Sequence, residues 1–397
     1  MRIAIDRIET FVIRVPERTD FRWLSLSRPL GEFVLARIEA DGVVGWGEVV
    51  GLRDWGDADG RRHGETPSTV TSIVHEELAP GLLGREVGLG ELAGRLDALV
   101  VGNPYAKALV DIALHDLAGR ALGVPVHTLL GGPARATLPV AHMLGIMPVD
   151  EAVAEAHTAV QDGIRALQVK GGADLARDVE LIAALRDAHG PDLWLRLDAN
   201  TGYRGRAFAR RALRELADAG VDLVEQPLFG AAALAEARAD SPVPIMADEA
   251  CWTPADALDL VARRAVDALS VYVGKAGGLA RAREICAIAR AADLPHDLNG
   301  ALELGIGNAA NVHLAIASPA ELLPCVVPVN APAGAFSTVT AGRYFQDDVI
   351  TAPWPLEDGR LAAPEGPGLG VDVDEEKVQH YCIQHRESAA NVGASNA

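Results

Sequence analysis

The sequence predicts an α/β protein built around one barrel of parallel strands, and three observations lead to this prediction. Short apolar runs alternate with helical patterns from about residue 138 to residue 329. Charged residues end four of these runs, and the gaps between Lys170, Asp198, Glu225 and Asp248 are 28, 27 and 23 residues. Such a gap holds one strand, one helix and two loops. A chain of 397 residues with 49% hydrophobic content also suffices for a barrel and a smaller domain.

The first 132 residues predict the smaller domain, which we expect to be α+β. Residues 2–15 alternate loosely like a strand, and two further strands flank Asp41-Gly42, a pair that suits a tight hairpin turn. Helical patterns follow at 67–80, 90–99 and 104–122. Gly131-Gly-Pro then marks the boundary with the barrel.

Residues 133–359 predict the barrel, because eight strand-like runs would close one. We expect these strands near 138–143, 165–170, 193–198, 221–225, 243–248, 268–273, 293–298 and 323–329. Residues 360–385 are expected to return to the first domain. Residues 386–397 lack large apolar side chains and are expected to be disordered.

Composition excludes several classes of function. A net charge of −19 with scattered basic residues argues against a nucleic-acid partner. The four cysteines are far apart and form no C-x-x-C pair, which indicates a reducing compartment and no zinc site. No signal peptide and no apolar run of membrane-spanning length is found. We therefore expect a cytoplasmic enzyme of small molecules, with no membrane partner.

The charged residues at the ends of the runs predict a metal site. In a barrel of parallel strands they would all lie at the carboxyl-end rim, where active sites of such barrels lie. Asp198, Glu225 and Asp248 would repel one another there unless a hard divalent cation lay between them. Oxygen ligands favour Mg²⁺, with Mn²⁺ as the other candidate.

Five motifs together resemble a known family. They are Asp198-Ala-Asn, Glu225-Gln-Pro, Asp248-Glu249, Lys275-Ala-Gly-Gly-Leu and Glu303-Leu-Gly-Ile-Gly. In this order and spacing the chain resembles the enolase superfamily, in its muconate lactonizing enzyme and mandelate racemase branch. The resemblance implies an α+β capping domain on a modified (β/α)7β TIM-type barrel. It also implies Mg²⁺ held by the three acids above, a small substrate carboxylate bound to that metal, and a homo-oligomer.

Lys170 is the candidate base. A proton α to a carboxylate is too weakly acidic for a side chain to remove unaided, and a cation that stabilises the developing charge makes removal feasible. A nearby cation and partial burial would both depress the pKa of Lys170. The family pattern here is Lys-x-Lys, and Gln168 stands in the first position of this chain.

The opposite side of the barrel departs from the family. Tyr272 stands where muconate lactonizing relatives have a second lysine, and Lys275 aligns with a common rim lysine. Tyr272 is therefore either an acid or a wall residue. His296 is either a catalytic acid or a histidine tucked behind its strand, and Asn299 aligns better with the histidine of mandelate racemase relatives.

Two loops complete the list of candidates. Residues 21–28 and the glycine-rich segment 51–64, with Arg53, Arg61, Arg62 and His63, are either solvated loops or a lid over the barrel mouth. The substrate-binding candidates are Trp23, Arg53, Gln168, Asn200, Glu249, Lys275, Asn299 and Glu303.

One strong base without a lysine partner favours one-base chemistry, namely cycloisomerisation or β-elimination with Lys170. Racemisation or epimerisation with Tyr272 or His296 as the second group is the alternative. A metal-binding but catalytically inactive homologue is a third reading, which the presence of Lys170 beside the acids disfavours.

Overall fold

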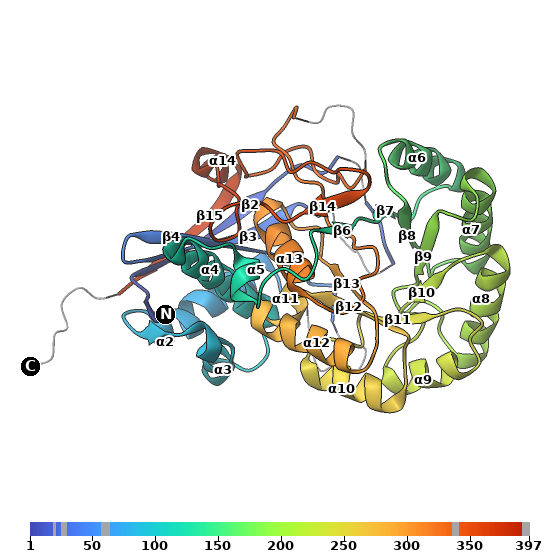
Figure 1. Cartoon of the computed structure of the whole chain (residues 1–397), viewed down its shortest axis with the longest axis horizontal. Coiled ribbons are helices and arrows are strands. Elements are labelled where there is room, and N and C mark those ends of the chain that lie inside the picture. The colour runs from blue at the N-terminus through green and yellow to red at the C-terminus, as the bar shows by residue number, and fades with distance from the viewer. Residues whose placement is uncertain (19–20, 25–29, 57–63, 336–340, 391–397) are drawn as a thin grey trace, which may run out of the picture.

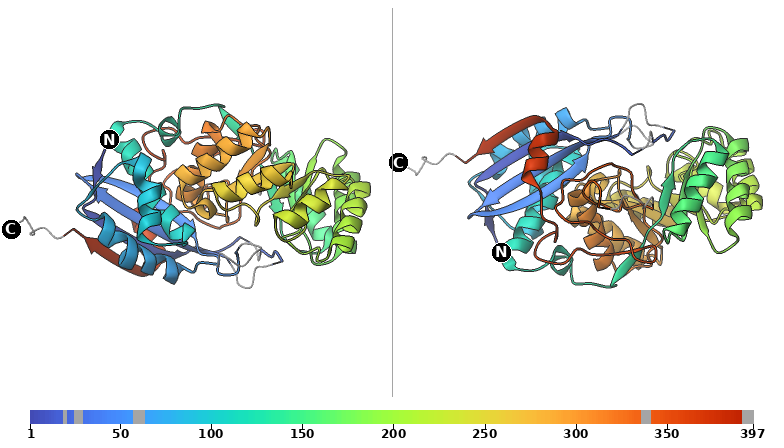
Figure 2. Two further views of the ribbon diagram at one scale, coloured as in Figure 1. Left: turned by 90° about the horizontal axis from the view of Figure 1, so that it is seen from below. Right: turned by 90° about the horizontal axis from the view of Figure 1, so that it is seen from above.

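The computed structural model describes residues 1–18, 21–24, 30–56, 64–335 and 341–390. A mixed α+β domain lies at one end of the molecule and the helices α6 to α9 of a barrel lie at the other (Figures 1 and 2). We call the mixed domain the capping domain. Strands from the start and the end of the chain pair within it, so the chain leaves this domain for the barrel and then returns.

The capping domain is built on a four-stranded antiparallel sheet in the order β15–β2–β3–β4. Its strands are β2 (Arg7–Arg14), β3 (Glu32–Ala40), β4 (Val43–Val50) and β15 (Cys382–Ala389). Helix α4 (Pro104–Leu122) packs on this sheet. The close contact needs glycine on β4, because a Cβ at Gly45 would lie 2.2 Å from the carbonyl oxygen of Ala113.

The predicted hairpin is confirmed. Ala40 pairs with Val43 across the turn. Asp41 and Gly42 have φ of 49° and 73°, the left-handed pair that a tight hairpin turn requires. The smaller elements of this half are β1 (Ile3–Ala4), α1 (Pro67–Ser72), the π-helix η1 (Ile73–Leu78), α2 (Ala79–Leu82), β5 (Glu86–Val87), α3 (Leu89–Leu99) and α5 (Val126–Leu129).

The expected disorder of residues 386–397 is wrong for its first part. Residues Arg386 to Ala389 belong to β15 and pair in register with β2, where Arg386 lies opposite Thr10. Backbone hydrogen bonds to the edge of the sheet hold this segment, and they need no large apolar side chains. Residues 391–397 lie outside the described residues.

The barrel sheet has seven parallel strands in chain order, which agrees with the predicted β/α repeat. They are β7 (His142–Leu144), β8 (Ala166–Lys170), β9 (Trp194–Asp198), β10 (Leu223–Glu225), β11 (Ile245–Ala247), β12 (Ala268–Tyr272) and β13 (His296–Asn299). Helices cover its outside (Figure 1). They are α6 (Val149–Gln161), α7 (Leu175–His189), α8 (Arg206–Ala219), α9 (Ala231–Ala239), α10 (Pro254–Arg263), α12 (Leu279–Ala291) and α13 (Gly305–Ala317). The short helix α11 (Val273–Ala276) directly follows β12 and packs against α4.

The eighth strand position closes the ring without a full strand. Residues 323–329 were expected to form a strand, but here the structure has only single bridges, from Leu322 to His296 and from Cys325 to Val140. Pro324 and Pro328 have no N–H to donate, which prevents a continuous ladder. The remaining elements are β6 (Thr137–Pro139), β14 (Arg360–Ala362), which pairs with β6, and α14 (Glu375–Tyr381). No helix among the described residues is long and apolar enough to cross a membrane.

Candidate active site

Strand register brings the predicted rim residues together. Lys170, Asp198 and Glu225 are the last residues of β8, β9 and β10, and they lie side by side in register, Lys170 opposite Asp198 and Asp198 opposite Glu225. Asp248 directly follows β11. The carboxyl ends of four adjacent strands therefore place one ammonium group and three carboxylates on one rim. We call Asp198, Glu225 and Asp248 the rim carboxylates.

Lys170 is buried and ion-paired. Its Nζ donates to Asp198 Oδ2 at 2.6 Å and lies 5.5 Å from the ring centroid of Trp23. Burial lowers the pKa of Lys170, but the charges of Asp198 and Glu225 outweigh it, so the pKa lies above its ordinary value. The expected depression assumed a neighbouring cation, whereas the neighbours of this ammonium group are carboxylates.

The rim carboxylates are crowded in a way that favours cation binding. Burial, and then the charge of Asp198, raise the pKa of Glu225 to about 8, and burial also raises the pKa of Asp248. Glu225 Oε1 is buried and has no hydrogen-bond partner among the described residues. Among the described residues, no three Asp, Glu, His or Cys side chains are positioned in this structure so that they could hold a metal ion. The rim carboxylates nevertheless offer only oxygen ligands and up to three negative charges, which fits Mg²⁺ or Mn²⁺.

Asp248 is held from the other side by Lys275 and Tyr272. Lys275 Nζ donates to Asp248 Oδ1 at 2.6 Å, to the Asp248 carbonyl at 2.8 Å and to the Ser270 carbonyl at 3.1 Å. The Tyr272 hydroxyl lies 3.5 Å from Asp248 Oδ2, and Lys275 Nζ lies 4.6 Å from the centre of the Tyr272 ring. Burial and the charge of Asp248 raise the pKa of Tyr272 well above its ordinary value. Tyr272 is therefore a neutral donor in the site.

Three other candidates support the carboxylates. Gln168 Nε2 donates to Glu225 Oε2 at 2.9 Å, and Asn200 Nδ2 donates to Glu249 Oε1 at 3.2 Å. The backbone N–H of Asn200 also donates to Asp198 Oδ1 at 2.9 Å. Burial raises the pKa of Glu249 well above its ordinary value. These contacts orient the acids.

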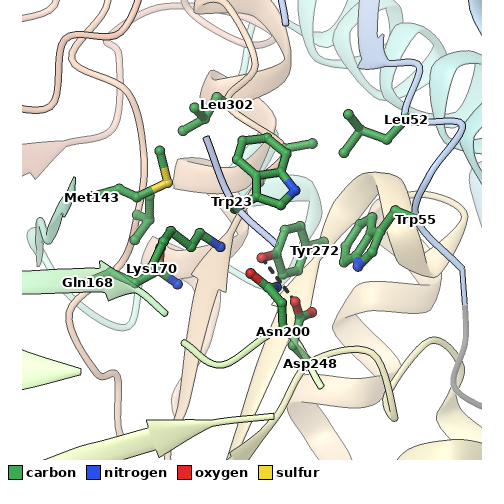
Figure 3. A pocket seen from close by; sticks show the side chains of 13 residues that line it. Trp23, Leu52, Trp55, Met143, Gln168, Lys170, Asn200, Asp248, Tyr272 and Leu302 are labelled. Carbon is green, nitrogen blue, oxygen red and sulfur yellow. Dashed lines mark hydrogen bonds between the residues drawn. The ribbon is translucent and has the colours of Figure 1, made fainter. Parts of the chain in front are cut away.

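A cavity of about 450 Å³, its open mouth included, lies above these groups. Figure 3 shows Lys170, Gln168, Asn200, Asp248 and Tyr272 gathered in its lower part. Its lining residues are Trp23, Leu52, Trp55, Met143, Gln168, Lys170, Asn200, Asp248, Tyr272, Gly300, Ala301, Leu302 and Val326. Leu52 and Trp55 belong to the segment 51–64 that was considered as a lid over the barrel mouth, although neither residue was singled out. Met143, Gly300, Ala301, Leu302 and Val326 were not predicted, because they come from segments that carry no charge pattern.

His296 is not at the cavity, which argues against its proposed role as a catalytic acid. Its Nε2 lies 2.7 Å from the Oγ of Ser318, the residue that directly follows helix α13, and its Nδ1 lies 3.1 Å from the Asp297 carbonyl oxygen. Burial lowers its pKa to about 4. Side chains alternate along a strand, and the Asp297 carboxylate pairs with Arg196 inside the barrel, so His296 must point outward.

The other candidates also lie off the cavity lining. Asn299 bridges two strands, because its Nδ2 donates to Ser270 Oγ at 3.1 Å and its Oδ1 accepts from the Val326 N–H at 2.7 Å. Glu303 Oε1 accepts from the Ala301 N–H at 3.1 Å and so braces the cavity wall. Arg53 is exposed. Arg61, Arg62 and His63 of the expected lid lie outside the described residues.

Sequence reasoning missed a buried ion pair inside the barrel. Arg196, fully buried, pairs with Asp297 through Nη1, and its Nε lies 3.3 Å from Glu225 Oε2. Arg196 stands two residues before Asp198, and Asp297 two before Asn299. A charged residue two positions before a rim residue lies on the same face of its strand and so points into the barrel, and this spacing could have revealed the pair.

Comparison with known proteins agrees with this geometry. Residues 7–131 match the family model of the mandelate racemase / muconate lactonizing enzyme N-terminal domain, and residues 151–377 match the enolase C-terminal domain-like model. Muconate cycloisomerase 1 of Rhodococcus opacus is 35% identical, over 96% of this chain and 98% of that protein. The L-Ala-D/L-Glu epimerase of Bacillus subtilis is 33% identical, over 93% and 97%. The crystal structure of muconate lactonizing enzyme from Pseudomonas fluorescens complexed with muconolactone superposes with a TM-score of 0.84 at 29% identity, over 96% and 99%. The chain therefore belongs to the mandelate racemase and muconate lactonizing enzyme family of the enolase superfamily.

Proposed function

We propose that this chain is an isomerase or lyase that removes the proton α to a substrate carboxylate with Lys170 as the only base, and that it completes a cycloisomerisation or a β-elimination. The observation that supports this most directly is the Lys170 ammonium group at the cavity, 2.6 Å from a rim carboxylate. The cycloisomerase relatives at 32–35% identity support the same reaction type.

The rim carboxylates would hold the divalent metal on which this family generally depends. Bound there, Mg²⁺ or Mn²⁺ would stabilise the negative charge that develops on the substrate carboxylate when the α-proton leaves. It would also offset the burial and the charge of Asp198, which together raise the pKa of Glu225 and Asp248. The Lys275 contacts to Asp248 and the Gln168 contact to Glu225 keep two of these acids in place.

Lys170 can act as base only as a neutral amine, so the Asp198 contact must weaken before each turnover. Burial of Lys170 favours the neutral amine, whereas the charge of Asp198 and the face of the Trp23 ring favour the ammonium form. Lys170 takes the α-proton from one side and returns it to the product or to the leaving group on that side. Strands β8 and β12 lie four positions apart in the eight-position ring, so Tyr272 faces the substrate from the opposite side.

Tyr272 would serve as a neutral donor to a substrate oxygen, because its raised pKa keeps the hydroxyl protonated. The alternative is epimerisation with Tyr272 as the second acid. The 33% identical epimerase of Bacillus subtilis is the observation that favours it. A phenol with so high a pKa is a weak partner for a reversible proton transfer, so one-base chemistry is preferred.

Lys170→Met tests the proposal, since it keeps the length of the side chain and removes the amine. The readout is exchange of the α-hydrogen in D2O with L-Ala-L-Glu and N-succinyl amino acids, and entry of solvent deuterium into the lactone product with cis,cis-muconate, with Mg²⁺ present. We expect a loss of at least about 10³-fold. Lys107→Met is the matched control, because Lys107 is likewise buried and paired with an aspartate, at 2.8 Å, but lies outside this cavity. Turnover within tenfold of the parent in the Lys170 variant would refute the proposal.

A further inference from the structure

A charged pair crosses the interior of the barrel beneath the rim carboxylates. Arg196 of β9 and Asp297 of β13 are fully buried, and Nη1 of Arg196 donates to Oδ2 of Asp297. Their strands lie four positions apart in the sheet, so the pair spans the barrel. The interior of such a barrel is normally filled by apolar side chains. A buried ion pair is weak evidence for stability, because the hydration that both charges lose can outweigh their attraction. The pair therefore calls for another explanation.

Arg196 also contacts one of the rim carboxylates. Its Nε lies 3.3 Å from Oε2 of Glu225. Gln168, its neighbour in register on β8, donates from Nε2 to the same oxygen at 2.9 Å. Both residues stand two positions before a rim residue, so their side chains enter the barrel one layer below the rim. Two groups from that layer therefore hold Oε2, whereas Oε1 of Glu225 has no hydrogen-bond partner among the described residues and is left for a metal ion.

The charges of the pair suit this position. An arginine side chain stays protonated in proteins, so Arg196 alone beneath the rim would repel a cation bound there. Asp297 carries the opposite charge, and the pair therefore adds no net charge beneath the rim. The planar guanidinium group presents several donors in a fixed arrangement, which lets one side chain contact Glu225 and Asp297 together. Glu225 thus gains a fixed contact without a loss of attraction for a divalent cation.

We propose that Arg196 is a positioning residue for metal binding. With Asp297 as its counter-ion, it fixes the Glu225 carboxylate through Oε2, so that Oε1 is the oxygen that binds the divalent cation. This inference rests on the proposed function for the role of Glu225 as a metal ligand, and it adds two residues that do not touch the metal themselves. The pair then contributes to the affinity for the cation rather than to the stability of the fold.

The double variant Arg196→Met/Asp297→Leu tests the proposal, because it removes both charges together and keeps the barrel interior filled. Calorimetric titration of the full chain measures the dissociation constant of Mg²⁺, and denaturant unfolding measures stability. We expect the dissociation constant to rise by about 10- to 100-fold without a loss of stability. Arg238→Met/Asp267→Asn is the control, because this pair, 2.7 Å apart, lies at the other end of the barrel strands. Parental affinity in the first variant, or an equal loss in the control, overturns the proposal.

The nearly isosteric variant Asp297→Asn decides the question even if the double variant does not fold. It leaves the Arg196 charge unbalanced 3.3 Å from Glu225, so Mg²⁺ should bind at least about tenfold more weakly than in the parent. Parental affinity in Asp297→Asn contradicts the proposal. Glu225→Gln separates the two levels of inference. If it binds Mg²⁺ like the parent, the metal role of Glu225 in the proposed function fails. If it loses Mg²⁺ while Asp297→Asn does not, only the positioning role fails.

Discussion

Glu48 of the capping domain controls one wall of the cavity, and replacing it with glutamine should be costly. Glu48 is fully buried near the end of β4, and its two carboxylate oxygens accept hydrogen bonds from the Leu304 and Gly307 N–H groups at 2.6 and 2.7 Å. These N–H groups lie at the N-terminus of α13, where backbone N–H groups have no acceptor within the helix. The segment just before them, from Gly300 to Leu302, lines the cavity.

The expected magnitude follows from these two contacts. Glu48→Gln keeps one acceptor oxygen and turns the other contact into donor against donor, so one hydrogen bond to a charged group is lost and one buried N–H is left unpaired. We expect the free energy of unfolding to fall by about 2–4 kcal/mol. Burial raises the pKa of Glu48 well above its ordinary value, and the two N–H contacts only partly oppose this. Both hydrogen bonds are strongest with the ionised carboxylate, because each of its oxygens then accepts from one backbone N–H.

Denaturant unfolding followed by circular dichroism measures the change, and hydrogen exchange at Leu304 and Gly307 locates it. Glu32→Gln is the control, because Glu32 lies on the same sheet in an exposed ion pair with Arg14 and should cost less than about 1 kcal/mol. A loss below about 0.5 kcal/mol in Glu48→Gln, with unchanged exchange at both amides, would show that this carboxylate does not hold the wall.

Three further predictions concern the site and the barrel. Amide variants of the rim carboxylates (D198N, E225Q and D248N) should each abolish Mg²⁺ binding in calorimetric titration while the circular dichroism spectrum stays unchanged, and a variant with parental affinity removes its residue from the ligand set. Tyr272→Phe should raise the activation free energy of turnover by about 1.5–3 kcal/mol, the value of one hydrogen bond to a charged group. Deuterium should still enter the α-carbon of the product with one configuration. Deuterium found with the inverted configuration would instead favour an epimerase. The pKa of His296 is about 4 in the folded chain and about 6.5 in the unfolded chain, so the unfolded chain binds the proton first as the pH falls. The free energy of unfolding should therefore drop by up to about 3 kcal/mol between pH 6.5 and pH 4. The slope of unfolding free energy against pH should be shallower in His296→Asn, and an unchanged slope would show that another group controls it.

The barrel could be predicted from sequence because each β/α unit repeats the same physical constraint. A buried parallel strand needs a continuous apolar run, and a residue at its carboxyl end reaches the rim, as Lys170 and Asp198 do. The eighth strand could not be predicted in detail, because the run from Leu323 to Val329 is apolar but its prolines restrict pairing to single bridges. Strand β15 was missed for the opposite reason, since it is mostly exposed and is held by its backbone.

The candidate site divides in the same way. Residues that end strands were found by spacing, and their contacts then followed from register. Leu302 could not be found, because its position depends on a loop that is set by distant partners. Trp55 lies in the segment 51–64 that was considered as a lid, but its own contact with the cavity could not be found from the sequence. Leu302 has φ of +62°, and a neighbouring acid, Glu303, braces this segment. The alternation rule could have corrected His296, because it lies next to Asp297, whose side chain enters the barrel.

The pairing of β15 with β2 also bears on how the chain is made. Strand β4 ends at Val50 and β15 begins at Cys382, so the fourth strand of the capping sheet is synthesised about 330 residues after the third. At ordinary translation speeds this interval lasts roughly 20–60 s. The edge of β2 stays unpaired for that time, and the whole barrel emerges before it is covered. The capping domain thus finishes folding last, although most of it is synthesised first. While the edge of β2 is exposed on the ribosome, this protein is most open to pairing with a wrong strand.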